Sequence, residues 1–544
     1  MRRWLPLLLL AIAIGAAFSP SLRHGFVDWD DNAFLLGNPL IRAPLSASLA
    51  HWLLTPQMGY PIPVAIGLES LLWHVDNGAA WPFHLASLVL HMANAGLVLA
   101  LARRLGASTA FAALAALLFG LHPLTAEPVA WATGFKDVSM ATAALGATWA
   151  FLRWRQSPRA GWLWLAGGLA VASVLCKPGT VLWAGGLLAW LETAETDAAV
   201  RGRVRGLVIA ILACAIPIAL IGQAENVQTQ APDPAMTGVL QAPLALGHQI
   251  CHALWPVSLQ PRYFLDRAAG FRDPLTWLGL AALAGFLALL WRVRRLPGAL
   301  GLWLAAATYL PVSNLLPFHR FLADSYAYLP LACLAFGLAP LLSARLAARP
   351  RVRRVLGGVA VVAILASGSL TFGQCQRWAN GDALWQPVVA RWPAWPEARV
   401  LLAQGRDFDG RHAQAAAAWA ELFRADYPQQ YLSALAASLA QAGALEDAEC
   451  VFAEDVQGAH PTPMANGNLA AFLVSHPGRA PAYPEAAARA LAWARAQDRR
   501  QPLAWPEPWR QTLRARPDVP VAGPPAPWPQ RRCPVFQRLL PPGQ

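Results

Sequence analysis

The sequence predicts an all-α protein: a polytopic membrane domain followed by a short soluble helical region. Of its 544 residues, 56% are hydrophobic and only 13% are charged, and the mean hydropathy is +0.37. Long apolar runs recur through residues 1–373 and are separated by clusters of arginine, as in proteins that cross a bilayer repeatedly. From Gln374 the chain becomes Ala-rich, with polar positions at helical spacing, which favours soluble helical pairs.

About eleven segments are expected to cross the membrane. The first follows Arg2-Arg3 and runs from Trp4 to Phe18, and we interpret it as an uncleaved anchor rather than a signal peptide. The other expected spans are 82–102, 108–122, 137–153, 161–176, 179–191, 206–222, 274–291, 298–316, 326–344 and 355–373. Two further segments, 60–75 and 238–256, carry polar residues and are predicted to be re-entrant or interfacial helices that line a cavity.

The distribution of basic residues predicts the orientation of these spans. The arginine clusters are 103–104, 153–159, 201–205, 292–295 and 345–354. The opposite loops hold Arg23, Arg42, Lys136, Lys177, Arg262, Arg267, Arg272 and Arg320. Because basic residues accumulate in cytoplasmic loops, the N-terminus is predicted to be cytoplasmic and the region after residue 373 to be outside. The net charge of +13 is therefore a topology signal, and no nucleic-acid partner is expected.

Residues 374–502 are predicted to form tetratricopeptide-like helical repeats. Gly410 and Gly443 open similar segments 33 residues apart, and Trp419 and Phe452 follow them at equal offsets, a period typical of helical repeats. A looser third copy begins at Asn468. Residues 503–544 are rich in Pro and Trp, which predicts an extended tail that is packed on the repeats or disordered.

The seven cysteines show no metal-binding spacing, so the sequence predicts no zinc site. Cys450 and Cys533 could form a disulfide in an oxidising compartment.

The loop after the first span, FVDWDDNAFLLGNPLI (26–41), is the first candidate site. It places Asp28, Asp30 and Asp31 close together, and such carboxylates repel one another unless solvent, a cation or hydrogen-bond donors compensate them. The alternative is a solvated loop with a turn at Asn38-Pro39.

More polar residues gather at the predicted outer ends of other spans. These are His122, Glu127, Lys136, Asp137, Lys177, Arg262, Tyr263, His319, Arg320 and Asp324. Each alone could be an interfacial anchor. Together they predict a vestibule in which acids activate a hydroxyl and cations hold a phosphate. The chain's only two lysines, Lys136 and Lys177, both fall on this side.

Several motifs in order resemble one known family. They are FVDWDDNAFLLGNPLI, YPIPV, PFHLASLVLHMANA, LFGLHPLTAEPVAWATGFKD, CKPG and ADSYAYLPL, followed by the helical repeats. This order is similar to that of bacterial relatives of the transmembrane and tetratricopeptide-repeat O-mannosyltransferases. The resemblance implies a GT-C glycosyltransferase fold, a polyprenyl-phosphate sugar as donor, and transfer at the outer face of the bacterial inner membrane, with the repeats in the periplasm.

The resemblance also implies roles for individual residues. It implies that Asp30 and Asp31 are the family's paired acids, that Glu127 is the acid of the second outer loop, and that Lys136 and Asp137 are its basic-acidic pair. The chain has Phe135 and Ser325 where the family usually has arginine. Arg320 could substitute in space for the second of these arginines.

The resulting hypothesis is inverting transfer of a mannose-like hexose to an acceptor hydroxyl, with a protein as the favoured acceptor. Asp30 or Asp31 would act as general base, or both would hold a divalent cation. In this hypothesis Lys136, Lys177, Arg262 and Arg320 neutralise the leaving phosphate. Trp29, Tyr60 and Trp131 stack on the sugar or isoprenoid, and the repeats hold the acceptor. The alternatives are a non-catalytic membrane scaffold that recruits envelope proteins and a transporter of lipid-linked sugar.

Overall fold

A computed structural model describes residues 5–43, 61–229, 238–315, 320–424, 431–457, 464–478, 481–500, 503, 506–515 and 533–539. The chain divides into two compact units, residues 1–383 and 384–544. All regular secondary structure in the described residues is helical, which confirms the all-α prediction.

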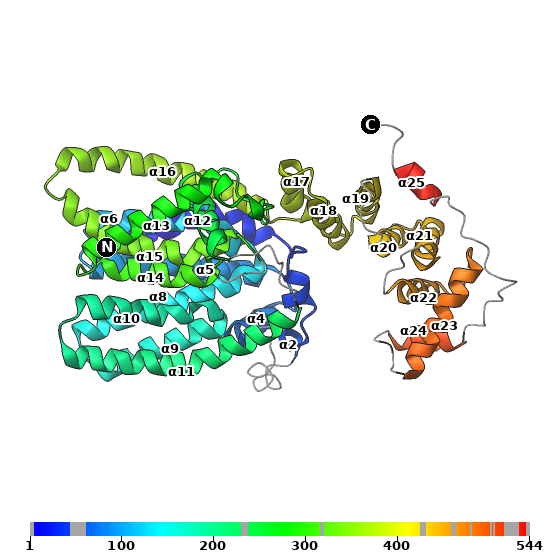
Figure 1. The fold of residues 1–544 in the computed structure, drawn as a ribbon, viewed down its shortest axis with the longest axis horizontal. Helices are drawn as coiled ribbons and strands as arrows, with labels where there is room; N and C mark the ends of the chain where they lie inside the picture. Colours follow the sequence, from blue (N-terminus) through cyan, green and yellow to red (C-terminus); the bar gives the residue numbers. More distant parts are fainter. Residues whose placement is uncertain are drawn as a thin grey trace. The chain divides into compact units, whose positions relative to one another are not determined.

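A helix occupies each of the predicted spans. These helices are α1 (Leu5–Phe18), α5 (Trp81–Arg104), α6 (Thr109–Gly120), α8 (Phe135–Gln156), α9 (Ala160–Cys176), α10 (Leu182–Ala194), α11 (Ala198–Thr229), α13 (Pro274–Val293), α14 (Ala299–Tyr309), α15 (Tyr328–Leu346) and α16 (Pro350–Gln376). They lie side by side with their axes roughly along one direction (Figure 1).

Fewer of these helices meet the requirements for a full crossing than the sequence predicts. In the described part of the chain, five helices are long and apolar enough to cross a membrane, and a sixth counts if the bent pair Thr109–Gly120 and Pro123–Ala130 forms one span. The others are shorter or more polar: α10 has 13 residues and α14 has 11. Five or six such helices are still the mark of a multi-pass membrane protein.

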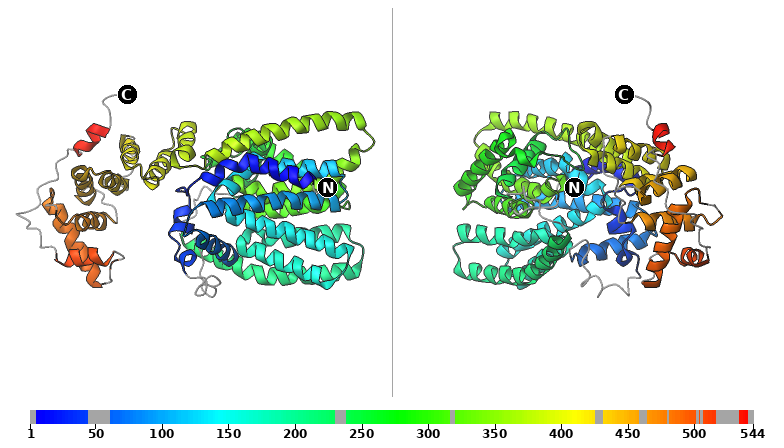
Figure 2. Two further views of the ribbon diagram at one scale, coloured as in Figure 1. Left: turned by 180° about the vertical axis from the view of Figure 1, so that it is seen from behind. Right: turned by 45° about the vertical axis from the view of Figure 1, so that its right-hand side comes forward.

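The two segments predicted to be re-entrant or interfacial also form helices. They are α4 (Pro63–Val75) and α12 (Gly238–Leu254), and neither is among the helices long and apolar enough to cross a membrane. Two views place α4 with the short α2 (Pro39–Arg42) at one end of the bundle (Figures 1 and 2). We call this the first-loop end.

Helix α12 packs very closely on α13. A Cβ atom on Gly279 would lie 1.9 Å from the backbone oxygen of Pro243, and one on Gly247 would lie 1.8 Å from that of Leu275. Only glycine permits such an approach of two backbones.

Ion pairs connect an arginine of α8 and an arginine of α11 to acids at the C-terminal end of α10. Arg205 pairs with Glu192 at 2.6 Å, and Arg155 pairs with Glu195. Both pairs join the C-terminal part of α10 to a neighbouring helix end.

The second unit is built from consecutive helical pairs. They are α18 (Pro396–Phe408) with α19 (His412–Arg424), α20 (Leu432–Gln441) with α21 (Leu445–Gln457), and α22 (Ala465–Ser475) with α23 (Pro484–Arg500). Gly410 and Gly443, which define the sequence period, occupy the turns inside the first two pairs with φ of 74° and 83°. Trp419 and Phe452 are buried in the second helix of each pair. The period therefore marks equivalent positions of two helical pairs.

A disulfide joins the tail region to these pairs. Cys450 on α21 is bonded to Cys533, which is separated from it by 83 residues and directly precedes α25 (Pro534–Leu539). Both cysteines are buried in the core of the unit. The bond holds the segment at Cys533 on the repeat core.

Replacing both Cys450 and Cys533 by serine should lower the free energy of unfolding of the second unit by about 2 to 5 kcal/mol, because the unfolded chain regains the entropy of the closed loop. Chemical denaturation of the full chain, followed by a probe placed in the repeats, would measure this loss. Adding reductant should shift the wild type to the midpoint of the variant and leave the variant unchanged. A wild-type midpoint that does not respond to reductant would contradict the prediction.

Candidate active site

The loop after α1 reaches the first-loop end in a constrained conformation. It forms one turn of π-helix, η2 (Asn32–Leu36), in which the N–H of Gly37 donates to the oxygen of Asn32 at 2.6 Å. Just before it, Asp30 has a left-handed backbone with φ of 75°. Non-glycine residues adopt this conformation at a cost, and such strain is concentrated at functional sites.

Asp31 joins this loop to the loop before α8. Its carboxylate is fully buried and accepts hydrogen bonds from the N–H of Val27 at 2.9 Å, the N–H of Thr133 at 3.0 Å and the hydroxyl of Thr133 at 2.5 Å. Burial raises the pKa of Asp31 to about 6, although these donors and the charge of Lys136 act in the opposite direction. Asp31 is therefore an anchor between two loops distant in sequence.

Asp30 differs from its neighbour in its surroundings. Its side chain is half-buried and makes no hydrogen bond or ion pair with the described residues. Its own backbone oxygen accepts from the N–H of Phe34 at 2.7 Å, which fixes the turn. The carboxylate is thus held at a fixed place while its oxygens stay available to a ligand.

Lys136 lies next to these acids in the first turn of α8. Its ammonium donates to the oxygen of Thr133 at 3.1 Å and lies 4.6 Å from the ring centre of Phe34 and 4.8 Å from that of Trp131. It forms no ion pair with a described residue, although the charges of Asp30 and Glu69 act on it. Its ammonium thus has one hydrogen bond and two aromatic rings beside it, and no carboxylate in an ion pair, among the described residues.

Glu69 on α4 belongs to the same neighbourhood. It is fully buried, and neither of its carboxylate oxygens has a hydrogen-bond partner among the described residues. Burial raises the pKa of Glu69 to about 8; the charge of Lys136 lowers it and that of Asp31 raises it further. Glu69 is therefore mostly uncharged at neutral pH.

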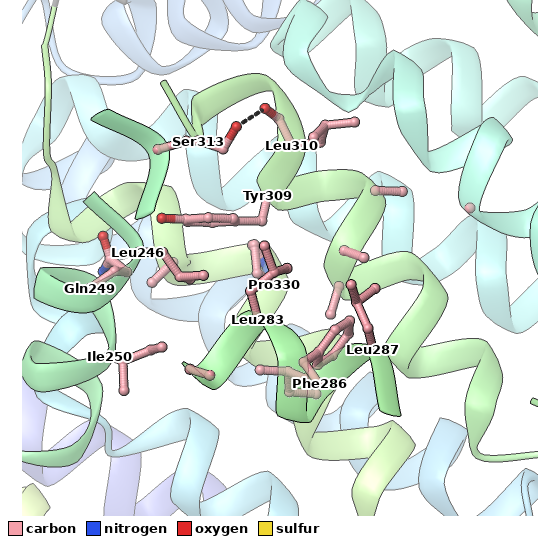
Figure 3. A pocket seen from close by; sticks show the side chains of 18 of the residues that line it. Leu246, Gln249, Ile250, Leu283, Phe286, Leu287, Tyr309, Leu310, Ser313 and Pro330 are labelled. Carbon is pink, nitrogen blue, oxygen red and sulfur yellow. Dashed lines mark hydrogen bonds between the residues drawn. The ribbon is translucent and has the colours of Figure 1, made fainter. Parts of the chain in front are cut away.

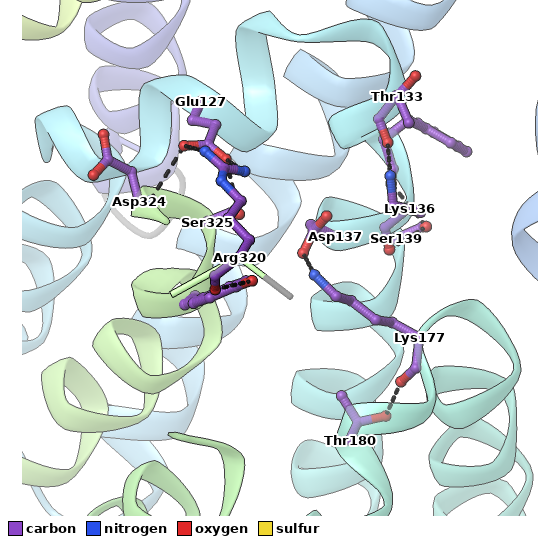
Figure 4. Close-up of polar contacts among 12 residues, drawn as sticks. Glu127, Thr133, Lys136, Asp137, Ser139, Lys177, Thr180, Arg320, Asp324 and Ser325 are labelled. Atoms are coloured by element: carbon purple, nitrogen blue, oxygen red, sulfur yellow. Dashed lines mark hydrogen bonds and ion pairs between the residues drawn. The ribbon is translucent and has the colours of Figure 1, made fainter. Parts of the chain in front are cut away.

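The other predicted charged residues are paired (Figure 4). Lys177 forms an ion pair with Asp137. Arg320 holds Glu127 through two hydrogen bonds of 2.7 Å and 3.2 Å. The hydroxyl of Ser325 donates to the same carboxylate at 3.0 Å. Arg320 and Ser325, five residues apart, thus both bond to Glu127.

The remaining predicted residues are distributed around the Glu127 pair. The hydroxyl of Tyr263 donates to Asp324 at 2.7 Å, and burial, followed by the charge of Asp324, raises the pKa of Tyr263 well above its usual value. The guanidinium of Arg320 lies 5.4 Å from the ring centre of Trp29, and that of Arg262 lies 5.5 Å from the ring centre of Phe264. Tyr60 and His319 lie outside the described residues.

Two residues of the site were missed by reasoning from the sequence. Thr133 gave no signal, because a threonine in a loop is common and its partner is 102 residues away. Glu69 gave a partial signal as an acid within the apolar segment 60–75. His122 proves to be a cap: it accepts from the N–H of Leu124 at 3.2 Å and lies 2.9 Å from the oxygen of Ala253.

A large apolar cavity opens between α10, α12, α13, α14 and α15 (Figure 3). Its volume is about 860 Å³, and leucine, alanine and phenylalanine side chains make up most of its wall. Polar side chains in the wall include those of Gln249, Tyr309 and Ser313. Leu124 and Ala327 also line it, and each lies within three residues of the Glu127–Ser325 contact in sequence.

Comparison with known proteins gives one match in sequence. No family model matches the chain. Over 108 residues it is 39% identical to the protein O-mannosyl-transferase Tmtc2 of Drosophila melanogaster, a match that covers 18% of this chain and 11% of that protein. The chain thus spans about a tenth of the length of this relative. The similarity of this segment agrees with the resemblance seen in the motifs.

Two solved structures are similar over longer stretches. ArnT from Cupriavidus metallidurans in the apo state is 18% identical, with a TM-score of 0.39, over 74% of this chain and 73% of that chain. The apo oligosaccharyltransferase of Archaeoglobus fulgidus is 15% identical, with a TM-score of 0.41, over 68% of this chain and 55% of that chain.

Replacing Thr133 by valine should raise the pKa of Asp31 above about 6, because the lost hydroxyl stabilises the charged carboxylate. Infrared titration of the protonated carboxyl band, assigned with Asp31→Asn, would measure the shift. Thr180→Val, which removes a buried hydroxyl beside Lys177, is the matched control and should leave the band of Asp31 unchanged. An unaltered Asp31 titration in Thr133→Val would contradict the anchor.

Replacing Arg320 by methionine should cost about 3 to 5 kcal/mol of stability, because Glu127 is left as an unpaired buried charge. The double variant Arg320→Met/Glu127→Gln should recover a large part of this loss, since residue 127 is then uncharged. The free energy of unfolding in detergent, measured for the wild type, both single variants and the double variant, gives the coupling energy between the two residues. Equal losses in the single and double variants would refute a dependence of Glu127 on Arg320.

Proposed function

We propose that the protein is a membrane glycosyltransferase that moves a hexose from a polyprenyl-phosphate donor to an acceptor hydroxyl at the first-loop end. The observation that carries this proposal is the pair of Asp30 and Lys136. Asp30 is an acid without side-chain partners among the described residues, on a strained backbone, and Lys136 lacks an ion pair within the same part of the chain. A base and a cation held ready in one site suit transfer from a lipid phosphate.

In the proposed reaction the acceptor oxygen attacks the anomeric carbon of the donor sugar. The bond from that carbon to the phosphate oxygen breaks, and its electron pair leaves with the lipid phosphate. Asp30 takes the proton of the acceptor hydroxyl, and Lys136 stabilises the negative charge on the phosphate. Attack from the face opposite the phosphate makes this an inverting transfer.

The paired cations have a different role from the one expected from the sequence. Lys177 and Arg320 already neutralise Asp137 and Glu127, so we assign them to holding the site together. Lys136 is then the principal phosphate ligand among the residues described here. Compact ammonium groups suit a single phosphate in this way.

The apolar cavity supports a lipid donor. Its volume of about 860 Å³ is that of a site for a large ligand, and its aliphatic wall suits an isoprenoid chain. Leu124 and Ala327 line it close in sequence to Glu127 and Ser325, so a chain bound there would have one end near the Glu127 group.

We assign a mannose-like sugar and a protein acceptor. The partial similarity to an O-mannosyl-transferase supports the sugar, and the helical pairs of the second unit suit a tetratricopeptide-like surface for an extended peptide. The Cys450–Cys533 bond fits an oxidising compartment such as the periplasm, which agrees with the orientation predicted from the arginines. In that orientation the protein lies in the bacterial inner membrane.

A divalent cation at Asp30 and Asp31 is the alternative to a base. Three hydrogen bonds from Val27 and Thr133 occupy three of the about four lone-pair sites of the Asp31 carboxylate, which leaves about one for a cation. We therefore propose Asp30 as a base and Asp31 as its support. Loss of transfer on chelation that is restored by Mg²⁺ or Mn²⁺ would favour the cation instead.

Asp30→Asn is the sharpest test. Asparagine tolerates the left-handed backbone, so the variant should fold like the wild type while transfer of radiolabelled hexose from polyprenyl phosphate falls about 100-fold or more, the scale of a lost general base. Asp28→Asn, in the same loop, is the control and should retain transfer. A wild type that transfers none of a panel of sugars would favour the scaffold, and an active Asp30→Asn would remove the base.

A further inference from the structure

Helix α5 carries a stripe of polar side chains inside the membrane domain. His84, Ser87, His91 and Asn94 are all buried, with at most 1% of each exposed. Their spacing of three, four and three residues places them on one face of the helix. Polar groups at this depth are costly unless they are hydrogen-bonded. Nδ1 of His84, Oγ of Ser87 and Oδ1 of Asn94 have no hydrogen-bond partner among the described residues, whereas His91 and Nδ2 of Asn94 are hydrogen-bonded.

The hydroxyl of Tyr328 is the centre of a hydrogen-bonded network on this stripe. It lies 2.7 Å from Nδ1 of His91 and accepts from Nδ2 of Asn94 at 3.1 Å. Nε2 of His91 lies 3.0 Å from the oxygen of Gly120, and Asn94 also donates to the oxygen of Val138 at 3.1 Å. One arrangement of protons satisfies all four contacts: a neutral His91 with its proton on Nε2, and Tyr328 donating to Nδ1.

The atoms held by this network belong to segments that carry the site. Tyr328 directly follows the turn η9 (Asp324–Ala327), whose Ser325 holds Glu127. Val138 lies two residues after Lys136 on α8. Gly120 ends α6, just ahead of the chain that leads to Glu127. Three helices are thus fixed to α5, and the contacts of α8 and α15 lie within three residues of Lys136 and Ser325.

Aromatic rings enclose the network. The ring of His91 lies 5.0 Å from that of Phe18 on α1 and 5.4 Å from that of Phe119 on α6, and the ring of Phe119 lies 5.3 Å from that of Tyr328. These contacts keep the polar atoms away from lipid and restrict the rotamers of His91 and Tyr328. The network therefore has little freedom to adopt another arrangement.

We infer that His91, Asn94 and Tyr328 are positioning residues that set the distance between Lys136 and the Glu127–Arg320 pair. They do not touch the substrate. They act through the starts of α8 and α15, which they hold against the buried face of α5. The inference rests on the proposed function only for its activity readout. In that readout the effect should be large, because a misplacement of about 1 Å in a catalytic group can cost about 100-fold in rate.

Tyr328→Phe keeps the ring and removes the central hydroxyl. We expect kcat for hexose transfer to fall about tenfold or more, with a smaller change in KM for the lipid donor. Thr148→Val is the matched control, because it removes a buried hydroxyl of α8 that accepts from Trp183 at 3.2 Å, far along the helix from Lys136. It should keep the wild-type kcat. A Tyr328→Phe enzyme within twofold of wild type, or an equal loss in Thr148→Val, would overturn the inference.

Substitution of His91 separates positioning from loss of packing. His91→Gln retains an acceptor and a donor on one side chain and should keep a large part of kcat, whereas His91→Leu should lose it as Tyr328→Phe does. Equal activity in the two variants would overturn the role of the hydrogen bonds.

Hydrogen exchange tests the network without any transfer assay. In Tyr328→Phe, exchange should increase in the peptides around 121–136 and 320–327, and in Thr148→Val it should not. If the wild type transfers no sugar, the proposed function fails while this measurement still tests the network. Unchanged exchange in both peptides would overturn the inference directly.

Discussion

The candidate site depends on one buried carboxylate. Asp31 joins the loop after α1 to the loop before α8 through three hydrogen bonds to Val27 and Thr133. Without these donors a fully buried carboxylate would be strongly unfavourable, so the loops must dock together. That docking brings Asp30 and Phe34 next to Lys136. The two adjacent acids therefore have different roles: Asp31 is an anchor, and Asp30 is open to a ligand.

Two other acids of the site are also compensated by partners from elsewhere in the chain. Asp137 is neutralised by Lys177 and Glu127 by Arg320, and both cations lie in segments between helices. In a medium of low dielectric such pairs persist only when further hydrogen bonds complete them, and Ser325 and the N–H of Asp324 supply these to Glu127. Lys177 and Arg320 thus act mainly as ties between segments distant in sequence.

Much of the membrane fold was predictable, because an apolar run of sufficient length has few alternatives to a helix. The positions of α5, α8 and α16 follow directly from such runs. The presence of Asp30, Asp31 and Lys136 in one place was also predictable, from the resemblance and the topology. The partners of these acids could not be predicted. Asp31 contacts Thr133 across 102 residues and Glu127 contacts Arg320 across 193 residues, and spacing along the chain carries no information about such contacts.

A charge balance around Lys136 explains why Glu69 can be buried without a partner. If Asp30, Asp31 and Glu69 were all ionised, three negative charges would surround a single ammonium, and an incoming lipid phosphate would be repelled. Burial raises the pKa of Glu69 to about 8, so this acid is mostly neutral at pH 7. The donors from Val27 and Thr133 stabilise the charged form of Asp31 and do not cancel its charge. Burial lowers the pKa of Lys136, whereas the charges of Asp137 and Asp30 raise it, so a neutral Glu69 reduces the repulsion that an anion meets beside Lys136.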